Sequence, residues 1–178
     1  MFRVSSLLIV CCVFAPSLKA EDLVIFGDDS YPPVVYLDNG EVKGFIPAIL
    51  KQLEPITGDH YDIRLYPWKR AYELASRSEG GVIGISYTEE RAKQFDYSRP
   101  VYNDNIQVVT LQGRQFPFEN LSDLKGKVIG GVIGASYGDE VDKAIANGTI
   151  TMDRDIDQAG RLRKLLAGIE TLKLGSQD

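Results

Sequence analysis

Apolar strand-like runs alternate with helical patterns along this chain, and the alternation begins twice. The first series contains the apolar runs DLVIF, YDIRLYPW and VIGIS, separated by two stretches in which apolar residues recur at helical spacing. The second series opens with KVIGGVIG and continues through the helical stretch GDEVDKAIANG, the alternating run TITMD and the helical stretch QAGRLRKLLAG. Strands that alternate with helices predict parallel sheets covered by helices, so we expect an α/β fold.

The restart predicts two lobes in series. We expect a first α/β lobe over residues 21–109 and a second over residues 110–178, joined through the extended run NIQVVTLQG and the connector QFPFENLSDLKGK. In the first lobe, Asn39-Gly40 lies between two short strand-like pieces and predicts a hairpin. The helix that begins near Phe45 is expected to end at Pro55 and Gly58.

The last ten residues, IETLKLGSQD, fit this pattern poorly. A further strand of a parallel sheet is expected to be almost continuously apolar, whereas Glu170, Thr171 and Lys173 interrupt this stretch. The second lobe is therefore predicted to be incomplete.

The first twenty residues have the pattern of a secretory signal peptide. Arg3 precedes an apolar run from Val4 to Phe14, and small residues precede Glu21, which predicts cleavage after Ala20. The apolar run is shorter than the roughly 20 residues of a membrane-spanning helix, so a retained anchor is the less favoured interpretation. We expect export to the periplasm and no stable membrane insertion after cleavage.

Cysteine content and charge exclude several classes of function. Both cysteines lie in the predicted signal, so the mature chain has no disulfide framework, thiolate nucleophile or cysteine metal site. Removal of Arg3 and Lys19 leaves 18 basic and 25 acidic side chains, a net charge of −7 with His60 neutral. This balance opposes nucleic-acid binding, which needs clustered cations. We expect an acidic, exported monomer.

Polar residues follow the third apolar run, at the predicted carboxyl end of its strand. In open α/β sheets ligands bind at such ends, and Ser86, Thr88 and Arg91 all lie there. Arg91 can hold a carboxylate with two hydrogen bonds, Ser86 can add a hydroxyl, and Thr88 can cap a short helix whose free amides favour an anion. The alternative is a surface ion pair between Arg91 and a nearby acidic side chain. Spacing alone favours neither interpretation.

Other strand ends carry four further candidates. Asp28 can accept an ammonium and Tyr31 can wall an aliphatic group, although an Asx turn with a packed tyrosine is somewhat favoured at this position. Trp68 stands at the end of the next strand, where core packing is the alternative. Ser136 follows the first strand of the second lobe in a glycine-rich turn that can bind an anion.

Catalytic patterns find little support. His60 lies alone in the polar turn GDHYD, and the sequence contains no HExxH, GxSxG or metal-spaced cluster. The stretch GGVIGASYG lacks the G-x-G-x-x-G spacing of a dinucleotide site. The sequence therefore predicts a protein that is not an enzyme and needs no cofactor or metal.

Several motifs in order carry a family resemblance. GDDSYPP, GEVKGF, PWKRAYELA, GISYTEERAKQFDYSRPVY, LSDLKGKVIGG and GASYGDEV together resemble the bacterial family 3 extracellular solute-binding proteins, the periplasmic receptors of amino-acid ABC importers. The resemblance spans Asp22 to about Gly168. It implies a two-lobed type II periplasmic-binding fold that closes on a polar amino acid or similar small zwitterion and delivers it to an ABC transporter permease.

The resemblance also implies roles for the candidate residues. Arg91 would hold the ligand α-carboxylate, assisted by Ser86 and by the Ser136 turn of the other lobe. Asp28 would face the amino group, and two rings would sandwich the ligand side chain, namely those of Tyr31 and Trp68.

The chain departs from the family pattern in two places. Gly81 and Gly84 stand where members often carry an acid and a hydroxyl. Members also continue past the LLAG helix with an apolar strand that ends in a ligand-binding aspartate, a role that we do not assign to Asp178. The ending predicts C-terminal truncation, and with it weak binding or incomplete folding. A ligand-sensing module of a signalling system is the alternative function, and an enzyme on the same fold ranks last.

Overall fold

The computed structural model describes residues 22–168 and 172–176. The predicted signal peptide and Asp178 lie outside these residues. The strands are β1 (Asp22–Asp28), β2 (Ser30–Tyr31), β3 (Val35–Asp38), β4 (Glu41–Lys43), β5 (His60–Tyr66), β6 (Gly81–Val82), β7 (Ile106–Val109), β8 (Val128–Val132), β9 (Thr151–Asp155) and β10 (Leu172–Ser176). The helices are α1 (Phe45–Thr57), α2 (Trp68–Ser76), α3 (Asp139–Ala146) and α4 (Gln158–Leu166), with 3-10 turns η1 (Arg91–Lys93) and η2 (Leu121–Leu124).

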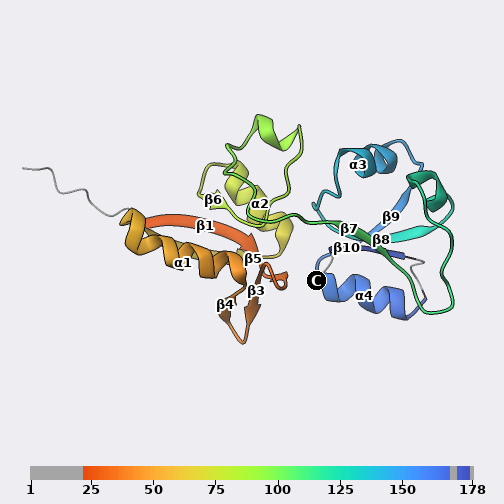
Figure 1. Cartoon of the computed structure of the whole chain (residues 1–178), viewed down its shortest axis with the longest axis horizontal. Helices are drawn as coiled ribbons and strands as arrows, with labels where there is room; N and C mark the ends of the chain where they lie inside the picture. Colours follow the sequence, from red (N-terminus) through yellow and green to blue (C-terminus); the bar gives the residue numbers. More distant parts are fainter. Residues whose placement is uncertain (1–21, 169–171, 177–178) are drawn as a thin grey trace, which may run out of the picture.

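These elements form two bodies, which lie side by side in Figure 1. We call the sheet β5-β1-β6, the small sheet β2-β3-β4 and the helices α1 and α2 the first lobe. The sheet β7-β10-β8-β9 with α3 and α4 is the second lobe. This arrangement agrees with the α/β fold of two lobes that the sequence predicts.

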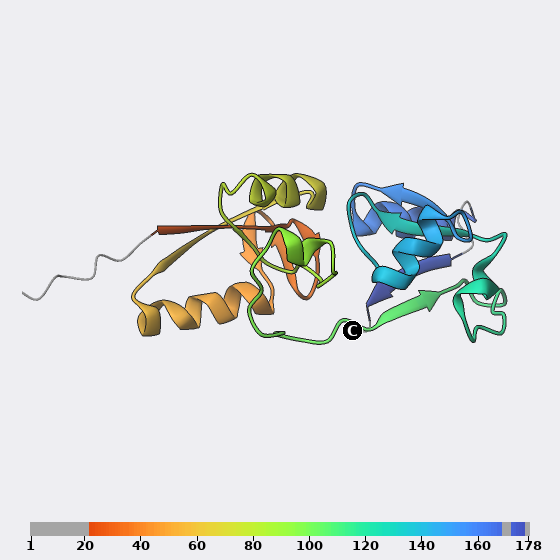
Figure 2. The same ribbon diagram turned by 90° about the horizontal axis from the view of Figure 1, so that it is seen from above.

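The first lobe is built on a parallel sheet with β1 at its centre. Phe26 of β1 packs with Ala71 and Ala75 of α2, while Leu65 of β5 packs with Ile46 of α1. The two helices therefore cover different faces of the sheet, and Figure 2 shows them on opposite sides of β1. Packing on both faces of the sheet explains why the stretch LVIF within β1 is continuously apolar.

The predicted hairpin and the first helix end are confirmed, with one correction. Asn39 and Gly40 have φ of 51° and 83°, as a two-residue type I′ turn between β3 and β4 requires. Gly58 is left-handed at φ 80°, and its N–H donates to the Glu54 carbonyl at 2.9 Å, which closes α1. The prediction that Pro55 ends α1 is wrong, because the proline lies in the last turn, where a single missing N–H does not stop the helix.

In place of the third predicted strand, the run VIGIS, only the two-residue strand β6 forms. Only β6 pairs with β1, and the N–H of Ile83 adds one more bond to the Phe26 carbonyl at 2.9 Å. Gly84 then has φ 69°, which turns the chain out of the extended conformation. The loop that follows carries Ser86 and Thr88 to η1.

The second lobe has a mixed sheet and its own core. β10 runs parallel to β8 and antiparallel to β7, and β8 runs parallel to β9. Leu124, Ile129 and Ile150 are almost fully buried in one cluster. The expectation that IETLKLGSQD fits a strand poorly is wrong for β10, which pairs with a strand on each side. This pairing satisfies its backbone groups and outweighs the polar interruptions.

The position of β7 differs from the predicted boundary between the lobes. The predicted first lobe ends at residue 109 and so includes β7, whereas the hydrogen bonds of β7 to β10 place this strand in the second sheet. The point at which the two lobes separate as folding units stays a prediction. Within the described residues, no helix combines the length and apolar character needed to cross a membrane.

Candidate functional site

A cavity of about 120 Å³ lies between the two lobes, at the carboxyl ends of β1, β5 and β8. Figure 2 shows the chain passing from one lobe to the other beside this junction. The cavity is lined by Tyr31, Trp68, Gly84, Ile85, Ser86, Arg91, Tyr102, Asp104, Ile106, Ala135, Ser136, Tyr137, Gln158 and Arg161. Five of the seven predicted site residues are thus brought together, and Asp28 and Thr88 are not among the lining residues.

Arg91 is buried, with 7% of its surface exposed. Its Nη1 donates to the backbone oxygen of Ser86 at 3.2 Å and to the hydroxyl oxygen at 2.8 Å. Its Nη2 donates across the lobe junction to the Gly134 carbonyl at 3.2 Å. The guanidinium carbon also lies 5.6 Å from the ring centre of Trp68 and 5.3 Å from that of Tyr72, within cation–π range.

The surface interpretation of Arg91 does not hold. No ion pair of Arg91 with a described acidic side chain is formed, and the neighbouring Glu90 pairs with Lys93 instead. Because a guanidinium has five N–H donors, the three bonds above leave the Nε–H and one Nη2–H. These two N–H groups are the donors that remain for a ligand carboxylate.

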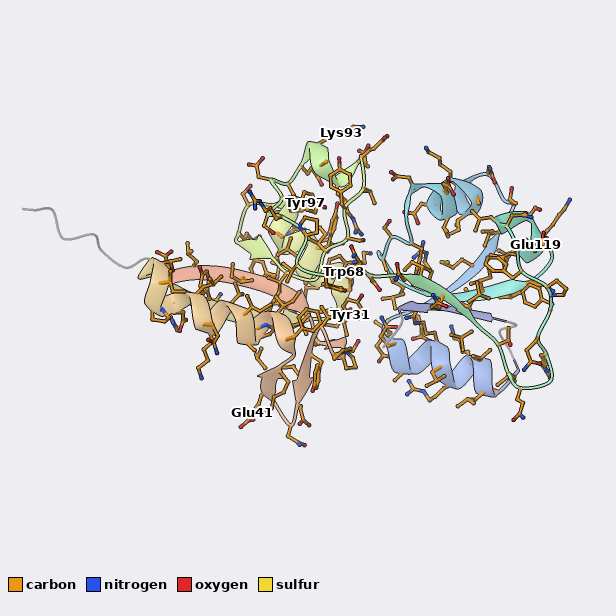
Figure 3. The ribbon with its side chains drawn as sticks, in the orientation of Figure 1. Tyr31, Glu41, Trp68, Lys93, Tyr97 and Glu119 are labelled. Carbon is orange, nitrogen blue, oxygen red and sulfur yellow. The ribbon has the colours of Figure 1, made fainter. Side chains whose placement is uncertain are left out.

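Trp68 and Gly134 join the two lobes. Trp68 opens α2, directly after Pro67, and its indole Nε1 donates to the Gly134 carbonyl at 2.9 Å. Figure 3 shows Trp68 and Tyr31 on the side of the first lobe that faces the second. The alternative interpretation, that Trp68 only packs in the core, is incomplete. The residue is 5% exposed, but it also lines the cavity.

Thr88 and Ser136 support the site rather than present free hydroxyl donors to it. Thr88 is buried, and its Oγ1 accepts from the backbone N–H of Arg91 at 3.1 Å. The helix expected after Thr88 is only the three-residue turn η1, so a helix dipole contributes little here. The Ser136 hydroxyl donates to Asp142 at 2.5 Å and is therefore already engaged.

Asp28 adopts the Asx turn that was the alternative interpretation. Its Oδ1 accepts from the backbone N–H of Ser30 at 3.0 Å and from the Ser30 hydroxyl at 3.3 Å. Burial raises the pKa of Asp28 to about 6, although the bond from the Ser30 N–H works in the opposite direction. The carboxyl therefore sits beside the junction without lining the cavity.

Tyr31 reaches residues that the sequence did not single out. Its hydroxyl donates to Asp104 Oδ2 at 2.5 Å and lies 3.1 Å from the Tyr102 hydroxyl. Burial, followed by the bond to Asp104, raises the pKa of Tyr31, so the phenol stays a neutral donor. Asp104 and Tyr102 belong to the aperiodic stretch VYNDN before β7, which offers no pattern signal.

The second lobe adds a buried cation that was also missed. Arg161 of α4 is 3% exposed, and its Nη1 donates to the Tyr137 hydroxyl at 3.1 Å. That hydroxyl also accepts from the backbone N–H of Val132 at 2.7 Å. Arg161 belongs to the charged run GRLRK, and such a run typically forms the solvent-exposed face of a helix, so the sequence did not indicate a buried cation.

The arrangement suits the binding of a small polar molecule. Two guanidinium groups, one carboxylate, three phenols and an indole line one cavity. The described residues contain no group of three or more His, Cys, Asp and Glu side chains that could hold a metal ion. His60 lies away from the cavity, with Nδ1 2.7 Å from Glu54 on the surface.

Comparison with known proteins identifies one family. The family model described as bacterial extracellular solute-binding proteins, family 3, matches residues 23–167. No curated protein matches the chain.

Solved structures share the fold. An ancestral arginine-binding protein bound to arginine has a TM-score of 0.75 at 23% identity, over 86% of this chain and 69% of that one. The arginine-, lysine-, histidine-binding protein of the thermophilic bacterium Geobacillus stearothermophilus has a TM-score of 0.73 at 22% identity, over 88% and 67%. An ancestral amino acid-binding protein, a precursor of cyclohexadienyl dehydratase, has a TM-score of 0.73 at 18% identity, over 87% and 70%. The predicted periplasmic-binding-protein fold is therefore confirmed.

Proposed function

The chain belongs to the bacterial extracellular solute-binding proteins, family 3, and from this membership we propose that it captures an amino acid or similar small zwitterion between its lobes. One observation carries the proposal: a buried arginine, Arg91, lines the cavity at the lobe junction and has no described acidic partner. Burying an uncompensated guanidinium is costly, and a ligand carboxylate supplies the missing charge.

The two lobes share the ligand contacts. Arg91 and Ser86 come from the first lobe, while the Ser136 turn comes from the second. A ligand that touches both lobes binds the closed arrangement better than the open one and shifts the population toward it. Solved proteins of the same fold carry arginine or glutamine, which supports an amino acid as the ligand class.

A thermal-shift panel tests this function. The mature chain is heated with each of the twenty amino acids, and at least one is expected to raise the melting temperature, because a ligand that binds only the folded state stabilises it. Calorimetry on that amino acid with Arg91→Ala is expected to show at least about a tenfold loss of affinity, about 1.4 kcal/mol, since a bond to a charged group is lost.

Arg99→Ala is the matched control, because it removes the same charge from an exposed position outside the cavity. Its affinity should equal that of the unmodified chain. The proposal fails if Arg91→Ala binds as tightly as the unmodified chain. It also fails if no amino acid stabilises either this chain or a version extended with the corresponding C-terminal region of a family member.

We further propose that the protein works in the periplasm after cleavage at Ala20, and that an ABC permease accepts its ligand. The family description as extracellular supports this location. N-terminal sequencing of the exported protein should begin at Glu21. Uptake of labelled amino acid should fall when the protein is deleted and return when it is supplied again.

Binding without turnover is the expected chemistry. The fold is shared with an ancestral precursor of a dehydratase, so catalysis has to be tested directly. The one carboxyl in the described lobes with a pKa raised to about 6, Asp28, lies outside the cavity and is held by Ser30. NMR of each stabilising amino acid after prolonged incubation should show unchanged ligand.

A further inference from the structure

Asp104 has one carboxylate oxygen engaged and one without a donor. Oδ2 accepts from the Tyr31 hydroxyl at 2.5 Å, whereas Oδ1 is buried and has no hydrogen-bond partner among the described residues. A buried carboxylate oxygen that has lost water and gained no donor is costly. Asp104 also lines the cavity, so a ligand bound there lies beside this carboxylate, and a small rotation of the carboxylate would bring Oδ1 to a ligand donor.

We propose that Asp104 determines specificity by accepting the ammonium group of the ligand, while Arg91 holds its carboxylate. This inference rests on the proposed function and makes it narrower: it names the residue that distinguishes an amino acid from a simple carboxylic acid of the same shape.

The charges that line the cavity fit a zwitterion. Arg91 offers the remaining N–H donors of its guanidinium and Asp104 offers a carboxylate, so the pair matches one anionic and one cationic end. Arg161, the other charged lining residue, is engaged with the Tyr137 hydroxyl. The Tyr31 hydroxyl fixes the Asp104 carboxylate from the first lobe, which leaves the ligand to satisfy the other oxygen.

Asp28 does not fill this role. It does not line the cavity, and its Oδ1 already accepts both donors of Ser30. The acceptor for the amino group therefore moves from the end of β1, where the sequence placed it, to the segment that joins the lobes.

Cavity size restricts the ligand as well. A dry cavity of about 150 Å³ holds benzene, which has six heavy atoms. The volume of about 120 Å³ found here suits a molecule of similar or smaller size. Glycine and alanine meet this limit, serine has one heavy atom more than benzene, and arginine has about twice as many.

Three matched pairs of probes test the inference by calorimetry. Glycine, L-alanine and L-serine are compared with acetate, propionate and 3-hydroxypropionate, which lack only the amino group. The unmodified chain is expected to bind at least one amino acid at least about tenfold more tightly than its partner acid, the effect of a charged hydrogen bond. Asp104→Asn keeps an acceptor for Tyr31 but removes the charge, so the preference should fall toward one.

Asp96→Asn is the control, because it removes an equal charge from an exposed position of the same lobe. This variant should prefer the amino acid over its partner acid as strongly as the unmodified chain does. The melting temperature of ligand-free Asp104→Asn should not fall, because an uncompensated charge has been removed. A merely structural role would lower that temperature and leave the preference unchanged.

Failure of this inference is distinguishable from failure of the proposed function. The inference is overturned if the unmodified chain binds each acid as tightly as its amino acid, if none of the three amino acids binds, or if Asp104→Asn retains the preference. The proposed function survives each of these results provided that some amino acid binds and Arg91→Ala weakens it. The comparison within the unmodified chain needs no variant and so decides even if Asp104→Asn does not fold.

Discussion

The two lobes contribute different chemistry to one cavity. The first lobe presents functional side chains, with Arg91 and Trp68 at the junction. The second lobe meets both with a single backbone atom, the Gly134 carbonyl, and its Ser136 hydroxyl is engaged elsewhere. Charged side chains can distinguish ligands by their charge. The Gly134 carbonyl instead accepts bonds from the first lobe and so holds the two lobes together. If the proposed function holds, we expect Arg91 of the first lobe to contribute to ligand selectivity and the Gly134 carbonyl of the second lobe to contribute to closure.

The lobes also differ in how their sheets are protected. In the second lobe, β10 lies between β7 and β8 over a compact core. In the first lobe, β6 is a two-residue edge strand beside a groove of about 660 Å³ that is lined largely by apolar residues, Ile25, Val82 and Ile83 among them. With a short edge strand, the first lobe depends more on the geometry of its turns.

Helix-capping glycines provide the strongest test of that difference. Gly44 precedes α1 at φ 118° and Gly138 precedes α3 at φ 92°, conformations that are nearly restricted to glycine. A Cβ at Gly44 would lie 2.4 Å from the Val34 carbonyl oxygen, whereas a Cβ at Gly138 meets nothing within 4 Å.

Gly44→Ala should therefore lower the free energy of unfolding by about 3 kcal/mol or more, and Gly138→Ala by about 1–3 kcal/mol from backbone strain alone. Urea unfolding measures both. Equal losses would show that the close approach of α1 to β3 does not distinguish the lobes.

Two carboxyls, one in each lobe, should change the stability of the protein with pH in opposite directions. The pKa of Asp28 rises from 3.8 to about 6 through burial, so the folded state binds more protons between these values. The free energy of unfolding should consequently fall as pH rises through this window, by up to about 3 kcal/mol. In the second lobe, the Ile156 N–H, followed by Lys164, holds the pKa of Asp155 below its usual value, so its contribution is lost as pH falls.

Asp28→Asn should thus be more stable than the unmodified chain at pH 7 and should converge with it near pH 4. Asp155→Asn should be less stable at pH 7, and its deficit should shrink in acid. Urea titrations from pH 4 to pH 7 measure both trends. If the free energy of unfolding of Asp28→Asn changes with pH in parallel with that of the unmodified chain, Asp28 does not cause the pH dependence of the first lobe.

The smallest expected effect concerns the junction itself. Trp68→Phe removes the indole bond to Gly134, a net loss of about 1 kcal/mol for the closed arrangement. The radius of gyration of the ligand-free protein, measured by small-angle scattering, should increase as open forms become populated. Tyr72→Phe removes a hydroxyl that bonds to Gln94 within the first lobe, so it should leave the radius unchanged.

Local patterns predicted most of the fold. Alternating apolar runs located β1, β5, β8 and β9, and glycines with positive φ ended α1 and turned the β3–β4 hairpin. The pattern failed where pairing is non-local. VIGIS is apolar enough for a strand, but Gly84 shortens it, and β10 forms despite its polar residues because two strands flank it.

The site was predictable where a residue lies beyond the carboxyl end of a strand. Tyr31 follows β1, Ser86 and Arg91 follow β6, and all three line the cavity. Asp104 was missed because its position depends on how the segment between the lobes runs past the cavity, which no periodicity encodes. Asp28 also lies at the carboxyl end of a strand, but its carboxylate accepts a hydrogen bond from Ser30 in its own turn and does not line the cavity.

The shared carbonyl of Gly134 affects how fast a ligand can arrive. Because the indole of Trp68 and the guanidinium of Arg91 both donate to it, the lobes can separate only after two bonds across the junction break. For molecules that close before a ligand arrives, the observed binding rate should level off at high solute concentration, at a ceiling set by the rate of opening rather than by diffusion.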